Sequence, residues 1–257
     1  MKDVNKVTAV ILAAGRGSRL LSLTDNIPKG LVYIAGNSLI HWQTESLRAA
    51  GITSIIIVTG YRGDAFDYLN LQTIANNRWD RTNMVGSIMC ALEKIDGPLI
   101  FSYSDILYHP NIVRKLLECD ADFAITYAVD WLDIWSSRFE NPLSDAESFK
   151  IDDNSIIVEI GKKADDVNAI QGQFMGLFKI STAGAGWIKS ALADDSKLRD
   201  TLDTTALINM LINNGRAITG IPISGNWMEI DDQHDLELAN KMLADRRLDI
   251  GVLEVKS

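Results

Sequence analysis

Cysteine, histidine and basic side chains are all scarce in this chain. Cys90 and Cys119 are too few for a disulfide scaffold and fall in stretches that predict helix, so we expect buried thiols in a reducing compartment. Basic residues number 25 against 34 acidic ones, and the net charge of −9 argues against binding to nucleic acid or an anionic membrane. The histidines lack the spacing of a metal or nucleophilic site, and we interpret them as structural: His41, His109 and His234.

Long apolar runs, internal repeats and low-complexity linkers are also missing. No run approaches the length of a membrane span, and the start of the chain, MKDVNKVTAV, lacks the apolar region of a signal peptide. We therefore expect a cytoplasmic protein without a membrane partner. The apolar content of 47% is ample for the core of one large α/β domain, so we expect residues 1–257 to form a single domain.

The strongest pattern is a glycine-rich turn after the first apolar run. Residues 7–12 (VTAVIL) carry no charge or proline and predict a strand buried on both faces of a parallel sheet. Gly15 and Gly17 then let the backbone approach a ligand, and successive N–H groups of such a loop can bind phosphate oxygens. Three cations near the turn suit a triphosphate: Arg16, Arg19 and Lys29.

Two common phosphate-binding motifs do not fit this turn. A P-loop would place Gly-Lys-Ser/Thr at its end, and Lys29 comes far too late. The dinucleotide-binding fingerprint would need a third glycine where Leu20 stands, and an acidic residue after the second strand, IIIVTGY, which has none. An ordinary strand-to-helix turn with surface cations is the remaining simple alternative.

Residues 12–31 resemble the opening motif LAAGxGxRLxxLTxxxPKxL of nucleotidyltransferases typified by the sugar-phosphate nucleotidylyltransferases. The matching residues are Leu12, Ala13, Ala14, Gly15, Gly17, Arg19, Leu20, Leu23, Thr24, Pro28, Lys29 and Leu31. The resemblance implies a mainly parallel, doubly wound, Rossmann-like α/β sheet with an antiparallel substrate-binding lobe, the nucleotide-diphospho-sugar transferase type. It also implies a nucleotide-binding half at about 1–120 and an acceptor-binding half at about 121–257.

The order of predicted elements agrees with this architecture. Strands at 52–61, 71–75 and 99–103 alternate with helices at 38–50, 61–70 and 83–94, as in βαβ units of a parallel sheet. From about residue 120 the pattern changes to short alternating runs (149–153, 156–163 and 169–180), which favour antiparallel strands at one end of the sheet. We expect helix over most of 183–211, a last strand at 218–224 and a final helix at 232–245.

Asp105, after a predicted strand, and Asp231, just before the last predicted helix, are the candidate ligands of Mg²⁺. In the family that the chain resembles, the acidic residue that matches Asp105 holds this ion. Asp105 follows the predicted strand LIFSY, and the carboxyl ends of strands are where open α/β sheets bind ligands. Asp231 stands in NWMEID, which resembles the family's late W-x-E-I/V-D segment. A pair of carboxylates can hold this hard cation. The alternative is that either aspartate caps a helix, and Glu229 and Asp232 are the next candidates.

The segment around Asn83 and Ser87 resembles cytidylyltransferases that act on phosphocholine and related phosphonates, in which an Asn-x-x-x-Ser helix start faces the pyrimidine. By that resemblance both side chains contact the base; Asn83 as a plain helix cap is the alternative. A glucose-1-phosphate nucleotidylyltransferase would carry a Gln- and Gly-rich segment here. The nucleotide-binding residues that we predict are Leu12, Ala13, Ala14, Gly15, Arg16, Gly17, Ser18, Arg19, Lys29, Asn83, Ser87, Ser104 and Asp105.

For the acceptor, the Glu159–Lys162 segment resembles a Glu-Lys pair that the family places beside the acceptor phosphate, although with a different spacing. Tryptophans could line a pocket for an amine by cation–π contact, with core packing as the alternative. The predicted acceptor-binding residues are Trp131, Trp135, Glu159, Lys162, Trp227 and Glu229.

The sequence thus predicts transfer of CMP from CTP to a small anionic acceptor, with release of pyrophosphate, for decoration of a surface polysaccharide or lipid. The acceptor would be phosphocholine, 2-aminoethylphosphonate or a phosphorylated amino-acid amide. Arg19 on the pyrophosphate and Lys29 near the phosphates are the predicted catalytic residues. A sugar-1-phosphate enzyme using UTP or dTTP, a silent nucleotide-binding subunit and a guide for a partner protein remain open, as does a homodimer.

Overall fold

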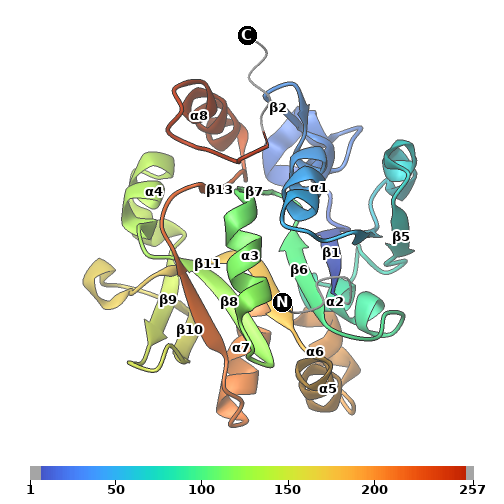
Figure 1. The fold of residues 1–257 in the computed structure, drawn as a ribbon, viewed down its shortest axis with the longest axis vertical. Helices are drawn as coiled ribbons and strands as arrows, with labels where there is room; N and C mark the ends of the chain where they lie inside the picture. The colour runs from blue at the N-terminus through green and yellow to red at the C-terminus, as the bar shows by residue number, and fades with distance from the viewer. Residues whose placement is uncertain (1–6, 253–257) are drawn as a thin grey trace.

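A seven-stranded sheet runs through the centre of the computed structural model, which describes residues 7–252 (Figure 1). The strand order is β12-β8-β11-β6-β1-β4-β5. Residues 1–6, which include most of the start that we expected to lack a signal peptide, and residues 253–257 lie outside the described part. The strands are β1 (Thr8–Ala13), β4 (Ser54–Thr59), β5 (Gln72–Ala75), β6 (Leu99–Tyr103), β8 (Phe123–Ala128), β11 (Gln173–Ile180) and β12 (Thr219–Ile223).

Most neighbouring strands of this sheet are parallel, which confirms the predicted architecture. β1 pairs in parallel with β4 and β6, β4 with β5, and β12 with β8. β11 is the exception, because it runs antiparallel between β6 and β8. The expectation that the antiparallel strands lie at one end of the sheet is therefore wrong for β11. This strand is buried along almost its whole length, so it gains more apolar burial inside the sheet than at an edge.

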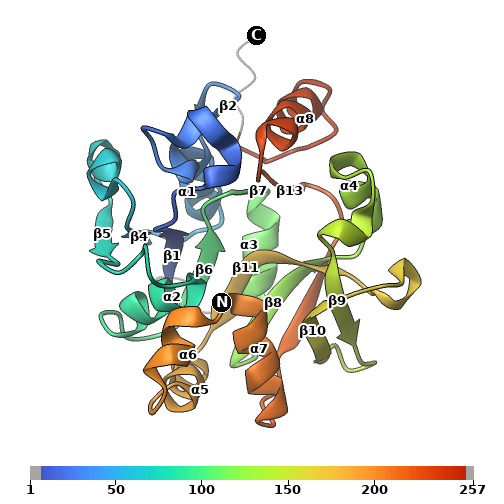
Figure 2. The same cartoon turned by 180° about the vertical axis from the view of Figure 1, so that it is seen from behind.

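Helices cover both faces of the sheet. α1 and α3 lie on one face, and α2, α5, α6 and α7 lie on the other (Figures 1 and 2). The predicted helix starts are confirmed where a capping side chain was visible in the sequence: Ser38 accepts a hydrogen bond from the backbone of His41 in the first turn of α1. The helices are α1 (Leu39–Ala49), α2 (Met84–Leu92), α3 (Pro110–Glu118), α4 (Trp131–Arg138), α5 (Thr182–Ala191), α6 (Ser196–Thr201), α7 (Thr204–Asn213) and α8 (Gln233–Ala244).

Three small antiparallel pairs flank the main sheet: β2 (Tyr33–Ile34) with β3 (Asn37–Ser38), β9 (Glu147–Ile151) with β10 (Ile157–Lys163), and β7 (Ile106–Tyr108) with β13 (Trp227–Glu229). β13 corrects the sequence-based prediction, which placed the last strand at 218–224. A three-residue strand is too short for alternation to reveal it. The pairing of β13 with β7 returns the end of the chain to the carboxyl edge of the sheet.

A second apolar cluster fastens this returning segment to the N-terminal part of the chain. It is separate from the main core and packs residues 20–42 against β13 and α8. The glycine-rich loop and the segment after β13 are thereby held on the same side of the molecule. The buried members of the cluster are Leu20, Val32, Ile34, Leu39, Trp42, Leu107, Met228, Ile230, Ala239, Leu243, Leu248 and Ile250.

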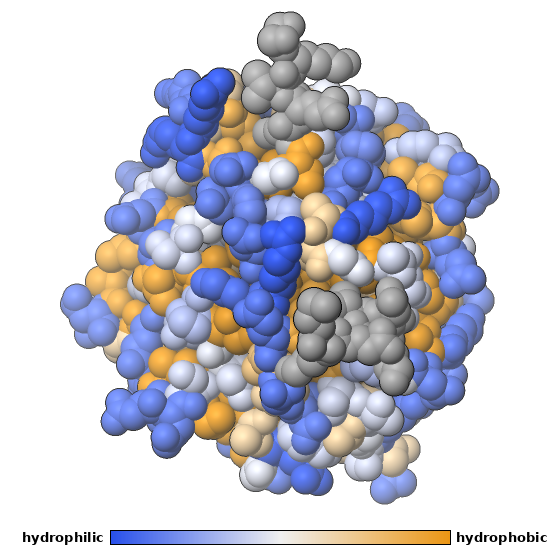
Figure 3. All heavy atoms as spheres, in the orientation of Figure 1, coloured by the Kyte–Doolittle hydropathy of each residue, from blue (hydrophilic) through white to orange (hydrophobic). Residues whose placement is uncertain are grey.

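The surface mixes hydrophilic and apolar residues on the face drawn in Figure 3. The large exposed apolar side chains lie on different elements, and they give no evidence for a dimer interface. The homodimer therefore stays a prediction. Within residues 7–252, every helix falls short of the length and apolar character needed to cross a membrane. Cys90 and Cys119 are only half-buried, which corrects the expectation of buried thiols, and Cys119 follows the end of α3.

Candidate active site

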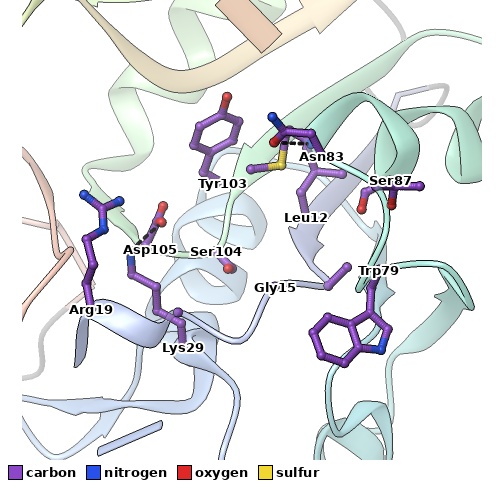
Figure 4. Close-up of a pocket in the computed structure, with 14 residues that line it drawn as sticks. Leu12, Gly15, Arg19, Lys29, Trp79, Asn83, Ser87, Tyr103, Ser104 and Asp105 are labelled. Carbon is purple, nitrogen blue, oxygen red and sulfur yellow. Dashed lines mark hydrogen bonds and ion pairs between the residues drawn. The ribbon is translucent and has the colours of Figure 1, made fainter. Parts of the chain in front are cut away.

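The carboxyl ends of β1 and β6 lie side by side and open a pocket at one edge of the sheet. The two strands are parallel and Leu12 pairs with Tyr103, so the turns that follow them meet. A cavity of about 240 Å³ lies there (Figure 4). Its walls hold most of the residues that we predict to bind nucleotide: Leu12, Ala14, Gly15, Gly17, Arg19, Lys29, Asn83, Ser87, Ser104 and Asp105.

Ala13, Arg16 and Ser18 are not part of these walls. Ala13 is the buried last residue of β1, and Ser18 begins a 3₁₀ turn on the exposed side of the loop. Arg16 pairs instead with Asp25, with 2.8 Å between Nη2 and Oδ1, and its guanidinium lies 5.7 Å from the centroid of the Tyr61 ring. A direct contact of these three residues with nucleotide therefore stays a prediction that the cavity does not support.

Gly17 allows Lys29 to pass beneath the loop. Its backbone has a φ of +74°, and a Cβ atom at this position would lie 2.5 Å from the Cβ of Lys29. The hydroxyl of Thr24 donates to the Gly17 carbonyl at 2.9 Å and fixes the turn. Any side chain at position 17 would displace the lysine. The motif glycine thus serves the placement of a cation as well as backbone approach to a ligand.

Three carboxylates gather at this end of the pocket. Asp105, Glu229 and Asp231 each offer an oxygen within 4.8 Å of the others. Antiparallel pairing of β7 with β13 brings them together, because the backbone N–H of Ile230 donates to the Asp105 carbonyl at 2.8 Å. The predicted pair Asp105 and Asp231 therefore meets in space. Asp232 does not join them, since its side chain caps α8 by accepting from Asp235.

The donor set suits a hard divalent cation. Oδ1 of Asp105 is buried and has no hydrogen-bond partner among the described residues, an arrangement that leaves a lone pair for a ligand. Carboxylate oxygens are the ligands that Mg²⁺ prefers. The helix-cap alternative for Asp105 does not hold, because α3 begins at Pro110 and is capped by the ring of His109.

Two basic side chains neutralise the carboxylates from the pocket side. Lys29 Nζ lies 2.8 Å from Oδ2 of Asp105 and 2.6 Å from Oδ1 of Asp231, and Arg19 Nη2 lies 2.8 Å from the latter oxygen. Burial would lower the pKa of Lys29, but the charges of Asp105 and Asp231 raise it above its ordinary value. The lysine therefore stays protonated.

The same balance separates the pKa values of two carboxylates. Burial would raise the pKa of Asp231, but Lys29, Arg19 and Arg138 together hold it below its ordinary value. Burial, followed by the charges of Asp231 and Asp105, raises the pKa of Glu229 to about 8. Asp231 is therefore the carboxylate that stays ionised at neutral pH.

Arg138 is a functional candidate that sequence reasoning missed. Its side chain is fully buried and comes from the end of α4. The guanidinium donates to both oxygens of Asp235 at 2.9 Å, to Glu229 at 3.1 Å and to Asp231 at 3.2 Å. In the sequence it stands in the polar stretch SSRFE and has the character of a surface residue. Only the tertiary fold places it behind the carboxylates.

The other end of the pocket carries no charge. Asn83 caps α2, since its Oδ1 accepts from the Met84 backbone at 2.8 Å, while its Nδ2 donates to the Thr201 carbonyl at 3.3 Å. Ser87 lies one turn further along the same helix and also faces the pocket. The cap that the sequence left as an alternative is thus present, and base contact by Asn83 stays a prediction.

The tryptophans form no open aromatic cage within residues 7–252. Trp131, Trp135 and Trp227 are at most 4% exposed, and their indole N–H groups donate to Ile170, Asp145 and Met175. Trp135 stacks on Trp227 with ring centroids 6.2 Å apart. Their burial supports the alternative of core packing, because a cage needs accessible ring faces.

The Glu159–Lys162 pair also lies apart from the cavity. Both residues belong to β10, in the separate pair of strands β9 and β10, and their side chains form an ion pair of 2.8 Å with each other. Glu229, by contrast, is on the predicted acceptor list and joins the carboxylate cluster. Trp79, Thr82, Met84 and Tyr103 line the cavity without having been predicted, because their residue types carry no phosphate-binding signature.

The chain is similar to known proteins along most of its length. The MobA-like NTP transferase domain matches residues 9–145. CTP:phosphoglutamine cytidylyltransferase of Campylobacter jejuni is 38% identical over 90% of this chain and 98% of its own. Choline-phosphate cytidylyltransferase of Streptococcus pneumoniae is 33% identical over 49% of this chain and 56% of its own. The solved inositol-1-phosphate CTP transferase from T. maritima has a TM-score of 0.75 at 19% identity, covering 95% and 97% of the two chains, a likeness of fold alone.

Proposed function

Because the chain belongs to the MobA-like NTP transferase family of nucleotidyltransferases, we propose that it transfers CMP from CTP to a small phosphorylated acceptor and releases pyrophosphate. The observation that carries this proposal is the pocket, which joins an end lined by cations and carboxylates to an uncharged end. We propose a phosphorylated amino-acid amide of the phosphoglutamine type as the acceptor, supported by similarity along nearly the whole chain. Phosphocholine and 2-aminoethylphosphonate are the related candidates.

The proposed reaction needs charge stabilisation more than covalent chemistry. An oxygen of the acceptor phosphate attacks the α-phosphorus of CTP, a new P–O bond forms, and the bond to the β-phosphate breaks with release of pyrophosphate. The acceptor oxygen is already ionised at neutral pH, so no general base is required. Arg19 and Lys29 would hold the triphosphate oxygens and stabilise the charge that develops on the leaving group.

Asp105 and Asp231 are the residues that we propose to hold Mg²⁺, with Glu229 beside them. The cation would neutralise phosphate charge when it is bound. Arg138 keeps Asp231 and Glu229 in place from behind, since it bonds both carboxylates. A cytoplasmic location, a homodimer and the division into nucleotide and acceptor halves remain predictions.

A substrate panel tests this proposal. The purified chain would be supplied with Mg²⁺ and each of CTP, UTP, dTTP, ATP and GTP, against phosphorylated glutamine amide, phosphocholine, 2-aminoethylphosphonate and glucose 1-phosphate, with release of pyrophosphate as the readout. We expect CTP with the phosphorylated amide to react fastest and the Asp231→Asn variant to be nearly inactive. Preference for glucose 1-phosphate with UTP or dTTP would favour a sugar nucleotidyltransferase. No release from any pair would favour a silent nucleotide-binding subunit.

A further inference from the structure

The two ends of the pocket differ in charge, and this difference orients a nucleoside triphosphate. Arg19, Lys29 and Asp105 stand at one end, whereas Trp79 and Ser87 stand at the other (Figure 4). A triphosphate, with the cation that accompanies it, belongs at the charged end. The base then lies at the uncharged end, beside Ser87. This orientation rests on the proposed function.

Asn76 lies behind the uncharged end and is buried, at 3% exposure. Its side-chain orientation follows from backbone groups. The backbone N–H of Arg78 donates to Oδ1 of Asn76 at 3.0 Å, and a backbone N–H can only donate. The amide oxygen is therefore fixed on that side, and Nδ2 must point the other way. No choice of amide flip remains open.

Both hydrogens of this amide are directed at hydroxyl oxygens. Nδ2 of Asn76 lies 2.9 Å from Oγ1 of Thr82 and 3.1 Å from Oγ of Ser87. Thr82 gives its own hydrogen to the carbonyl of Arg78 at 3.0 Å, so it can only accept from Asn76. Ser87 likewise accepts from Asn76, and its hydroxyl hydrogen then has no acceptor among the described residues.

Ser87 thus presents a hydrogen-bond donor to the pocket, and Asn76 fixes this polarity. Cytosine and uracil differ at ring position 3, where cytosine has an acceptor nitrogen and uracil an N–H donor. A fixed donor on Ser87 can form a hydrogen bond with the acceptor nitrogen of cytosine, but it opposes the N–H donor of uracil. We propose that Asn76 is a positioning residue that sets the preference for CTP over UTP by committing the Ser87 hydroxyl to donate.

An isosteric substitution reverses the polarity and tests the proposal. In Asn76→Asp, one carboxylate oxygen still accepts from the Arg78 backbone, while the other accepts the Ser87 hydrogen and turns the serine lone pairs toward the pocket. We expect the ratio of kcat/KM for CTP over UTP to fall at least about tenfold, the usual effect of an unmade buried hydrogen bond. The same loss is expected in Asn76→Ala.

The matched control is Asn77→Asp, which makes the same chemical change one residue away at an exposed position outside the cavity, and should keep the ratio. The double variant Asn76→Asp/Ser87→Ala should have the ratio of Ser87→Ala alone, because Asn76 acts only through Ser87. A merely structural role would instead add its effect to that of Ser87→Ala.

A change in the nucleotide instead of the protein keeps the proposal testable if the Asn76 variants fail to fold. The triphosphate of 3-deazacytidine has carbon in place of the acceptor nitrogen. In calorimetry without the phosphorylated acceptor substrate, we expect this analogue to bind the wild-type chain at least about tenfold more weakly than CTP does. The Ser87→Ala variant should bind the analogue and CTP equally.

Equal binding of the two nucleotides by the wild type, or an unchanged CTP over UTP ratio in folded Asn76 variants, would overturn this proposal alone. Wild-type protein that binds CTP but transfers no CMP would overturn the proposed function. The role of Asn76 would then be decided by the binding measurements with CTP and the 3-deaza analogue.

Discussion

Replacing Arg138 with methionine should destabilise the protein severely while leaving a side chain of similar volume. The guanidinium is the buried partner of Asp235, Glu229 and Asp231, at 2.9 to 3.2 Å. Its loss leaves Asp231 and Asp235, which are themselves buried, with less positive charge around them. Of these two aspartates, Lys29 can compensate the charge of Asp231 alone, because it bonds no oxygen of Asp235 in the described structure.

The expected loss follows from the cost of an uncompensated buried charge. Removing one partner of a buried ion pair typically costs about 3–5 kcal/mol. For a chain of this size, about 2–4 °C is lost per kcal/mol, so Tm should fall by about 6–20 °C. The matched control is Arg48→Met, since Arg48 pairs with Glu45 while 53% exposed, and an exposed pair contributes only about 0–1 kcal/mol.

The pH dependence of this loss has a definite sign. Arg138 lowers the pKa of both Glu229 and Asp231, so its removal raises the pKa of each carboxylate. A raised folded-state pKa of an acid destabilises the protein at high pH and is relieved by protonation as the pH falls. The difference in Tm between wild type and Arg138→Met should therefore be larger at pH 8 than at pH 5. Equal Tm values for the two variants and the wild type in thermal melts at pH 8 would refute this account of the cluster.

The remaining predictions concern turnover, measured as release of pyrophosphate from CTP. Asp105→Asn and Asp231→Asn should each lose most of kcat while circular dichroism stays native, because each removes a charge rather than an apolar contact; near-wild-type rates in saturating Mg²⁺ would exclude that residue from the metal site. Arg19→Ala and Lys29→Ala should lower kcat by about 10²–10³, as for other charge-stabilising donors. A change confined to acceptor affinity would contradict their assignment to the triphosphate. Arg16→Ala should lower kcat less than Arg19→Ala, since Arg16 pairs with Asp25 outside the cavity; equal losses would place it among the triphosphate ligands.

Local patterns in the sequence predicted the parts of the site that depend on short segments. Gly17 and Lys29 belong to one motif, and Asp105 follows a recognisable buried strand, so strand-end reasoning located them. Arg138 could not be found in this way, because its partners lie on β13 and α8, about 90 residues further along the chain. The same reasoning overrated the tryptophans, since residue type alone does not distinguish a packed indole from an exposed one.

The fold shows the same division between local and distant information. The buried parallel strands and the capped helices were predicted, because each carries its own pattern of apolar residues and end signals. The place of β11 between β6 and β8 was not, because its alternating pattern indicated an antiparallel strand but not which strands would flank it. Which strands become neighbours in a sheet depends on interactions along the whole chain.

The return of β13 to β7 also makes the carboxylate cluster depend on almost the whole chain. Lys29 and Asp231 are 202 positions apart, so the contact between them needs a long loop to close. A nascent chain that has emerged only as far as α7 contains the glycine-rich loop and Asp105, but it does not yet contain Asp231. A chain that ends before residue 231 would lack Asp231 and the members of the second apolar cluster that α8 supplies, so the carboxylate cluster cannot form until the end of the chain has folded back.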